Sequence, residues 1–83
     1  MTEDRFSYTD YFEQKVLTKR PYLKKEWCTR IVENPIRKEL QPDGERVRFW
    51  GRIDKFENKV FRVVTLADET TIHNAFPDRG FKE

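Results

Sequence analysis

The 83-residue sequence has few of the residues that form disulfides, cysteine- and histidine-based metal sites or glycine-rich phosphate-binding loops. It contains one cysteine, one histidine and three glycines. A single cysteine excludes an internal disulfide and a cysteine-rich zinc site, and the carboxylates do not follow the spacing of a calcium loop. Three scattered glycines exclude a glycine-rich loop that cradles phosphate. We therefore expect neither a metal ion nor a cofactor.

The sequence also lacks a long apolar run. No stretch approaches the ~18 consecutive apolar residues that a membrane-spanning helix needs. The N-terminus is polar and acidic, and it has no apolar core of a secretory signal. We therefore expect a soluble cytoplasmic protein that does not interact with a membrane.

The chain does contain many charges of both signs and many aromatic residues. There are 17 Lys and Arg and 15 Asp and Glu, which gives a net charge of +2, and aromatic residues make up 14% of the chain. This aromatic content indicates a folded domain rather than a disordered chain. A nucleic-acid binder would have to gather its basic residues on one surface. Length and composition predict a flexible N-terminus at residues 1–7 and one domain at residues 8–82.

Two amphipathic helices are predicted in the first half of the chain. Apolar residues at helical spacing between Tyr8 and Val16 predict the first helix, and Pro21 should end it. The second predicted helix covers residues 24–33. Cys28 lies on its apolar face, so we expect a buried rather than a reactive thiol. The short connector predicts that the two helices pack together as a hairpin.

Strands are predicted in the second half. Alternation of apolar and polar residues predicts a short edge strand at residues 36–41 and three further strands at 46–53, 59–66 and 71–76. The turn residues at 41–45 should join the first two strands as a hairpin. The predicted fold is α+β, with an N-terminal helical hairpin packed on a three- to four-stranded antiparallel β-meander.

The predicted strand at residues 46–53 carries a basic stripe with an aromatic residue in its middle. Arg48, Trp50 and Arg52 should share the face opposite the core. Guanidinium groups bind phosphate oxygens bidentately, and an exposed tryptophan can stack on an unpaired base, so the stripe suggests nucleic-acid binding. Alternatively, the arginines are solvated or paired with carboxylates, and Trp50 packs under a tail or a third helix.

Arg62 and His73 join this face if residues 68–69 form a two-residue turn. In the resulting register Asn74 and Phe76 point toward the core. A slip of one residue would turn the last strand over and remove His73 from the basic face. The predicted cluster therefore depends on the register of the last strand.

Arg62 lies in the middle of an apolar strand, where an unpaired charge would be costly. We expect it to have a partner, which is either a carboxylate such as Asp78 or Glu39 or an external phosphate. Arg79, close to Asp78, belongs either to an ion-paired tail or to a second phosphate contact.

His73 is the only histidine of the chain. Its near-neutral pKa would suit general acid or base catalysis of phosphodiester transfer. The alternative is an ordinary strand residue that is simply hydrogen-bonded.

Several short motifs between residues 8 and 82 are similar to features of one known superfamily. They are Arg20 between the helices, Trp27 followed by residues 31–35 (Ile-Val-Glu-Asn-Pro), residues 41–44 (Gln-Pro-Asp-Gly), Arg52, residues 61–64 (Phe-Arg-Val-Val) and residues 72–76 (Ile-His-Asn-Ala-Phe). In these motifs and in the order of its elements the chain resembles the small RelE/BrnT-type toxin superfamily and the uncharacterised bacterial domains related to it. The first strand that usually precedes the helices in that superfamily is not evident in residues 1–7.

The resemblance implies a function directed at RNA. Toxins of that superfamily cleave messenger RNA, usually in the ribosome, and a small antitoxin neutralises them. By position, Arg52, Arg62 and His73 match the basic and histidine residues that carry out this chemistry. The expected partners are therefore RNA or the ribosome, and a small antitoxin-like protein.

Two hypotheses follow. In the first, the protein is a metal-independent endoribonuclease in which the ribose 2′-OH attacks the adjacent phosphate. His73 is the general acid or base, Arg52 and Arg62 stabilise the phosphorane, and the RNA strand is held by Arg48, Trp50 and Arg79. In the second, the same fold is a non-enzymatic module that binds RNA or a protein.

Overall fold

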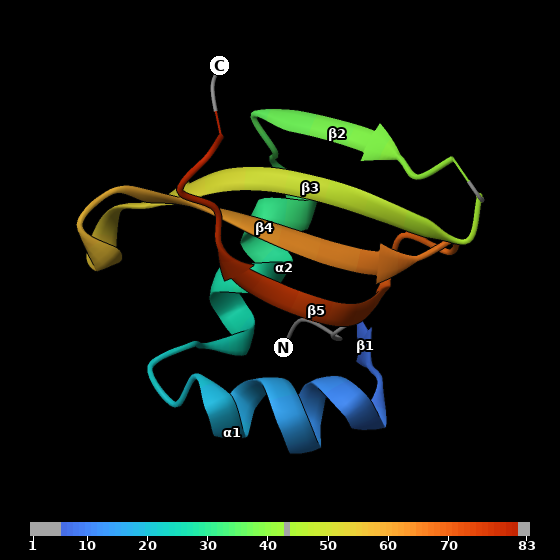
Figure 1. Cartoon of the computed structure of the whole chain (residues 1–83), viewed down its shortest axis with the longest axis horizontal. Helices are drawn as coiled ribbons and strands as arrows, with labels where there is room; N and C mark the ends of the chain where they lie inside the picture. Colours follow the sequence, from blue (N-terminus) through green and yellow to red (C-terminus); the bar gives the residue numbers. More distant parts are fainter. Residues whose placement is uncertain (1–5, 43, 82–83) are drawn as a thin grey trace, which may run out of the picture.

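The computed structural model of the chain describes residues 6–42 and 44–81, and it shows an α+β fold (Figure 1). The five strands of the sheet are β1 (Ser7–Tyr8), β2 (Arg37–Leu40), β3 (Arg46–Ile53), β4 (Lys59–Leu66) and β5 (Thr71–Pro77). Their order in the sheet is β1-β5-β4-β3-β2. The strands β2 to β5 form an antiparallel meander, and β1 adds to β5 in parallel orientation. The predicted meander is thus confirmed, and the sheet is mixed because of β1.

The first helix covers residues 10–19 and appears as α1 in Figure 1. It contains a π-helical stretch, η1 (Phe12–Val16), followed by α1 (Leu17–Lys19). The Thr9 hydroxyl oxygen accepts a hydrogen bond from the Phe12 N–H at 3.1 Å, which satisfies a donor at the start of the helix. The helix ends before Pro21, as the sequence predicts.

The second helix, α2 (Lys25–Glu33), packs its apolar face on the sheet. Trp27, Cys28, Ile31 and Val32 are all buried, which confirms the predicted face. Burial raises the pKa of the Cys28 thiol to about 12, so this group stays protonated at neutral pH. It is a small apolar core residue, as expected.

The hydrophobic core lies between the helices and one face of the sheet. The alternation in the sequence predicted this face correctly for β3 and β4, because Val47, Phe49, Phe61 and Val63 are at most 2% exposed. A short 3-10 helix, η2 (Asp54–Phe56), joins these two strands. The apolar face of the sheet therefore fixes which side chains of β3 and β4 remain on the opposite face.

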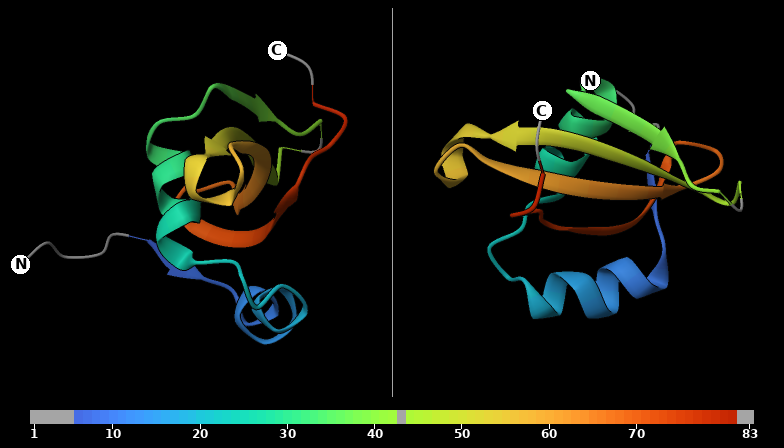
Figure 2. Two further views of the ribbon diagram at one scale, coloured as in Figure 1. Left: turned by 90° about the vertical axis from the view of Figure 1, so that its left-hand side faces the viewer. Right: turned by 45° about the horizontal axis from the view of Figure 1, so that its top comes forward.

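The predicted helical hairpin is wrong. α2 contacts β3, β4 and β5, whereas the η1 part of the first helix contacts β5. In the left view of Figure 2 α2 lies against one face of the sheet, and the first helix lies below β5. The physical reason is that Phe12 and Val16 bury their side chains in the core, and that η1, which contains them, packs on β5. Each helix therefore covers a different part of the sheet.

The predicted register of the last strand is correct only next to the turn. Thr65 pairs with Ile72 as a two-residue turn requires, but a β-bulge follows at Val64 and Thr65. Beyond the bulge Arg62 pairs with Phe76, one residue further along than predicted. The expectation that Asn74 and Phe76 point toward the core is therefore wrong. They lie opposite the core, and Ala75 is buried instead.

The N-terminal part of the described chain also differs from the prediction. Phe6 is buried in the core and Ser7 begins β1, so these two residues belong to the folded domain. The Ser7 N–H donates a hydrogen bond to the Thr70 carbonyl at 2.9 Å. A strand of two residues is too short to show a period, so alternation cannot predict it. Residues 1–5 of the predicted flexible N-terminus, Asp43 of the predicted turn and residues 82–83 lie outside the described residues.

Candidate functional site

The face of the sheet opposite α2, called the outer face below, carries most of the predicted site residues. In Figure 1 α2 lies behind β3 and β4, so this view looks onto the outer face. Arg48 pairs with Val64, Trp50 pairs with Arg62, and Arg52 pairs with Val60. Directly paired residues share a face, so the prediction that Arg48, Trp50, Arg52 and Arg62 lie together on this face is confirmed.

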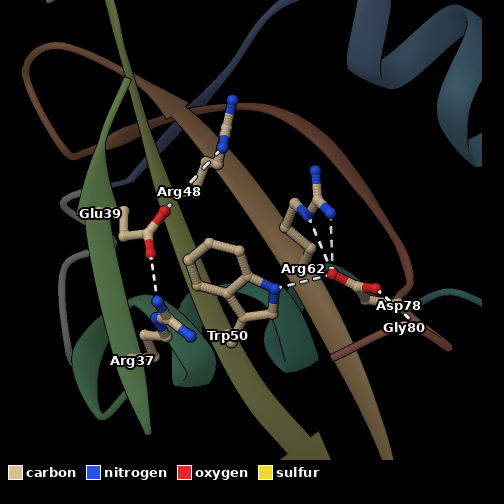
Figure 3. Close-up of polar contacts among 7 residues, drawn as sticks. All are labelled: Arg37, Glu39, Arg48, Trp50, Arg62, Asp78 and Gly80. Carbon is tan, nitrogen blue, oxygen red and sulfur yellow. Dashed lines mark hydrogen bonds and ion pairs between the residues drawn. The ribbon is translucent and has the colours of Figure 1, made fainter. Parts of the chain in front are cut away.

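Trp50 is covered by the chain that follows β5. It is only 5% exposed, its indole Nε1–H donates a hydrogen bond to Asp78 Oδ2 at 2.8 Å, and the Phe81 ring stacks on it with the centroids 5.8 Å apart. Figure 3 shows the indole between Arg37 and Arg62, with its nitrogen directed at Asp78. The expectation of an exposed stacking platform is wrong, and the alternative that Trp50 packs under a tail is confirmed. The physical reason is that burial of a large apolar ring stabilises the folded state.

Arg62 has the carboxylate partner that the sequence suggested. Its Nη2 and Nε atoms both donate hydrogen bonds to Asp78 Oδ2, at 2.8 and 3.2 Å (Figure 3). The hydrogen bond from Trp50 and the hydrogen bonds and charge of Arg62 hold the pKa of Asp78 below its usual value, although burial opposes this effect. The Oδ2 atom of Asp78 therefore accepts hydrogen bonds from three donor atoms.

Arg48 shares its carboxylate with a second guanidinium. Glu39 lies 2.6 Å from Arg37 Nη2 and 3.9 Å from Arg48 Nη1 (Figure 3). The Nε atom of Arg48 is buried and has no hydrogen-bond partner within the described part of the chain. One carboxylate cannot neutralise two guanidiniums, so this part of the outer face keeps a positive charge.

The remaining predicted cations lie at one end of the sheet. Arg52 is exposed on the outer face near the end of β3 and borders a pocket that also contains Arg30 and Asp54. Arg79 is exposed in the tail and borders a hollow beside Lys59. The guanidiniums that lie over the Trp50 ring are instead those of Arg37 and Arg62.

His73 lies at the bulge of β5 and faces the first helix. Its Nδ1 atom is 3.1 Å from the Thr9 hydroxyl, and its ring stacks on Tyr11 with the centroids 5.0 Å apart. Burial, and to a lesser degree the charge of Arg46, lower the pKa of His73 below its usual value. At neutral pH the imidazole is therefore uncharged.

The three predicted catalytic residues do not meet. Arg52 and Arg62 are diagonal neighbours on the outer face, because Arg62 pairs with the residue two positions before Arg52. His73 lies two strands away from Arg52 and towards the opposite end of the sheet. At about 3.3 Å per residue and 4.8 Å per strand, their Cα atoms are roughly 15–20 Å apart. This separation is larger than that of residues whose side chains are in direct contact.

A basic groove between the first helix and β5 was not predicted. We call it the helix–sheet groove, and its volume is about 300 Å³. It is lined by Tyr11, Lys15, Val16, Lys19, Arg20, Asn74 and Phe76. The ion pairs formed among the described residues involve none of its three cations.

Phe76 connects this groove to the outer face. The guanidinium carbon of Arg20 lies 5.9 Å from the centre of the Phe76 ring, and that of Arg62 lies 5.0 Å from it. Both contacts are within the range of cation–π attraction. The groove and the Arg62 region therefore form one continuous surface.

The sequence did contain a signal for the groove. Tyr11, Lys15 and Lys19 follow each other at intervals of four, so they form one stripe on a helix. Lys15 and Lys19 are a like-charge pair at this spacing, which slightly destabilises a helix. The spacing therefore places both ammonium groups on the side of the helix that carries Tyr11.

The influence of Arg46 on His73 leads to a first prediction. Replacement of Arg46 by glutamine removes the neighbouring positive charge, so the pKa of His73 should rise toward its ordinary value of 6.5. It should not reach that value, because burial is the larger cause of the shift. An NMR titration of the imidazole resonances of both proteins measures this. An unchanged pKa in the Arg46→Gln protein would mean that the charge of Arg46 does not act on His73.

Neither a metal centre nor a membrane span was found in the part of the chain that the structure describes. Residues 6–42 and 44–81 contain no group of three or more His, Cys, Asp or Glu side chains placed to hold a metal ion. None of the helices in these ranges is long and apolar enough to cross a membrane. Comparison of the chain with protein families, with curated proteins and with solved structures gives no match.

Proposed function

We propose that this protein binds single-stranded RNA through the helix–sheet groove, as a non-enzymatic module. The observation that carries the proposal is the set of cations in the groove. Lys15, Lys19 and Arg20 line one hollow beside Phe76, and no carboxylate of the described residues forms an ion pair with them. Cations without carboxylate partners attract the phosphate backbone of a nucleic acid.

The aromatic residues of the groove favour a single strand over a duplex. Tyr11 is 48% exposed and Phe76 is half-buried, so both present ring surface at the groove. Unpaired bases stack on aromatic side chains, and this contact depends little on sequence. The bases of a duplex are already stacked on one another. The resemblance to the RelE/BrnT-type superfamily also implies RNA as the ligand.

The arrangement supports binding better than cleavage. Phosphodiester transfer by the first hypothesis needs a general acid or base beside the phosphate that the arginines hold. His73 is roughly 15–20 Å from Arg52, and it contacts Thr9 and Tyr11 instead. Arg62 is bound to a carboxylate of the same chain.

A double replacement in the groove tests the proposal. With Lys19→Ala and Arg20→Ala together, the affinity for a short fluorescent single-stranded RNA should fall about tenfold at low salt. If the wild type contacts two phosphates through these residues, the slope of log K against log salt should become shallower by about 1.4. Fluorescence anisotropy across a salt series measures both quantities.

The matched control removes two cations that do not line the groove. Lys24 and Arg30 are exposed on and next to α2, and neither belongs to the groove-lining residues. The Lys24→Ala and Arg30→Ala double replacement changes the net charge by the same amount, and it should leave RNA affinity nearly unchanged. Equal losses in both double variants, or no RNA binding by the wild type, would contradict the proposal.

The RNA recovered after incubation with the protein should be intact. Cleavage that His73→Ala abolishes would show instead that the protein is an endoribonuclease.

A further inference from the structure

We propose that Trp50 and Arg62 form a binding site for one nucleotide of an RNA strand, and that the chain's own tail occupies this site. Asp78 lies where the phosphate would lie, and Phe81 lies where the base would lie. This inference rests on the proposed RNA binding, because it adds a second contact region for the same strand. It also assigns a role to the tail that follows β5.

The donors around Asp78 are those of an anion site. The carboxylate oxygen Oδ2 accepts hydrogen bonds from Trp50 Nε1 at 2.8 Å and from Arg62 Nη2 and Nε at 2.8 and 3.2 Å. A phosphate oxygen accepts hydrogen bonds from the same guanidinium and N–H donors. These donors belong to the paired strands β3 and β4 and not to the tail.

The ring above Trp50 occupies the place of a stacked base. The planes of Phe81 and Trp50 make an angle of 28°, with the centroids 5.8 Å apart. A nucleobase stacks on tryptophan in the same way. The guanidinium carbons of Arg37 and Arg62 lie 5.7 and 5.5 Å from the centre of the indole ring, so cations surround this position. The negative charge of a nucleotide would be favourable there.

The tail is anchored at Asp78, but open space remains beside it. One hollow, with a volume of about 450 Å³, lies between the tail and the outer face, and it is lined by residues that include Arg37, Glu39 and Gly80. A second hollow lies on the other side of the tail, beside Lys59 and Val60. A ligand can therefore reach the Trp50 ring from the side and displace Phe81.

The site is continuous with the helix–sheet groove. Phe76 contacts the guanidiniums of both Arg20 and Arg62, so it lies between the groove and the Trp50 site. A strand whose phosphates bind in the groove can continue past Phe76 to Trp50. The tail should then lower the apparent affinity for RNA, because only molecules with a displaced tail offer the second site.

Replacement of Phe81 by alanine tests the inference. Without the stacked ring, the affinity for the same short single-stranded RNA should rise roughly 2- to 10-fold, which is the range that one aromatic pair represents. In an NMR titration with adenosine 5′-monophosphate, the indole N–H resonance of Trp50 should shift at lower nucleotide concentration than in the wild type. A further replacement of Trp50 by leucine in this variant should abolish the gain in RNA affinity.

The controls distinguish a tail that competes with RNA from a tail that only stabilises the fold. Phe81→Leu keeps an apolar cover without an aromatic ring, and its affinity should lie between those of the wild type and Phe81→Ala. If Phe81→Ala remains folded by circular dichroism but binds RNA no more tightly, the tail only stabilises the fold and the inference is wrong.

The two proposals can fail separately. Loss of RNA affinity in the Lys19→Ala and Arg20→Ala protein, together with no gain from Phe81→Ala, would support RNA binding in the groove and contradict the nucleotide site at Trp50. Tighter binding by Phe81→Ala, together with no effect of the groove replacements, would retain the Trp50 site and reject the groove.

Discussion

Replacement of Asp78 by alanine should lower the free energy of unfolding by about 2–3 kcal/mol. The carboxylate accepts hydrogen bonds from the Trp50 indole and from the Arg62 guanidinium. Trp50 is buried and the Arg62 side chain is only 30% exposed, so water can replace this partner only in part. The total stability of an 83-residue domain is roughly 4–12 kcal/mol, so the loss should be large but not complete. Urea unfolding followed by circular dichroism measures it.

The contribution of the Asp78 carboxylate to the free energy of unfolding should disappear at low pH. The pKa of Asp78 in the folded protein lies below its ordinary value of 3.8. The contribution is therefore fully present above that value, and it is lost as the pH falls through the lower pKa of the folded state. The wild type and the Asp78→Ala protein should then converge in stability at low pH. A difference that stays constant at every pH would show that the charge of Asp78 does not contribute.

Arg79 provides the matched control for this measurement. It is the next residue of the tail, it is exposed, and no ion pair of the described residues involves it. Arg79→Ala should change the free energy of unfolding by less than about 0.5 kcal/mol. Equal losses in the Asp78 and Arg79 variants would mean that the tail as a whole, rather than the carboxylate, stabilises the fold.

Replacement of Gly51 by valine should lower the free energy of unfolding by about 1–3 kcal/mol. A Cβ atom at this position would lie 2.8 Å from Cγ1 of Ile31 and 3.3 Å from its Cβ. Ile31 is buried, so the contact can be relieved only by a shift of α2 on the sheet. Chemical unfolding of the two proteins measures the difference.

Two further variants make this result specific. Gly80→Ala adds a Cβ whose nearest atom within 4 Å is Asp78 Oδ1 at 3.7 Å, so stability should hardly change. Ile31→Ala in the Gly51→Val background makes room for the added side chain, so the double variant should lose less stability than the sum of the two single losses. Additive losses would contradict a direct clash between positions 31 and 51.

The sequence predicted the strands and the second helix well, because their periods are simple. The buried and outer residues of β3 follow strict alternation, and Ile31 with its apolar neighbours follows helical spacing. Alternation also placed Trp50 opposite the core. Alternation within a strand does not show whether a distant segment packs on a side chain. The stacking of Phe81 on Trp50 therefore could not be predicted from it.

The position of His73 could not be predicted from pairing rules. A single extra residue at the bulge changes which side chains of β5 face outwards, and no glycine or other local signal marks it. The two-residue strand β1 was missed for a similar reason, since two residues show no period. The helix–sheet groove could not be predicted, because the spacing of Lys15 and Lys19 does not show which strand the first helix lies beside.

The pairing of β1 with β5 has a consequence for how the chain acquires its structure. Ser7 and Tyr8 pair with Thr71 and Ile72, so one strand from near each end of the chain must meet in the same sheet. During synthesis the N-terminal segment leaves the ribosome long before β5 exists, and until then Phe12 lacks its place beside β5. Contacts between such distant parts of a chain slow folding. We expect the meander of β2 to β5 to assemble first, and the first helix to dock only after the last strand has been made.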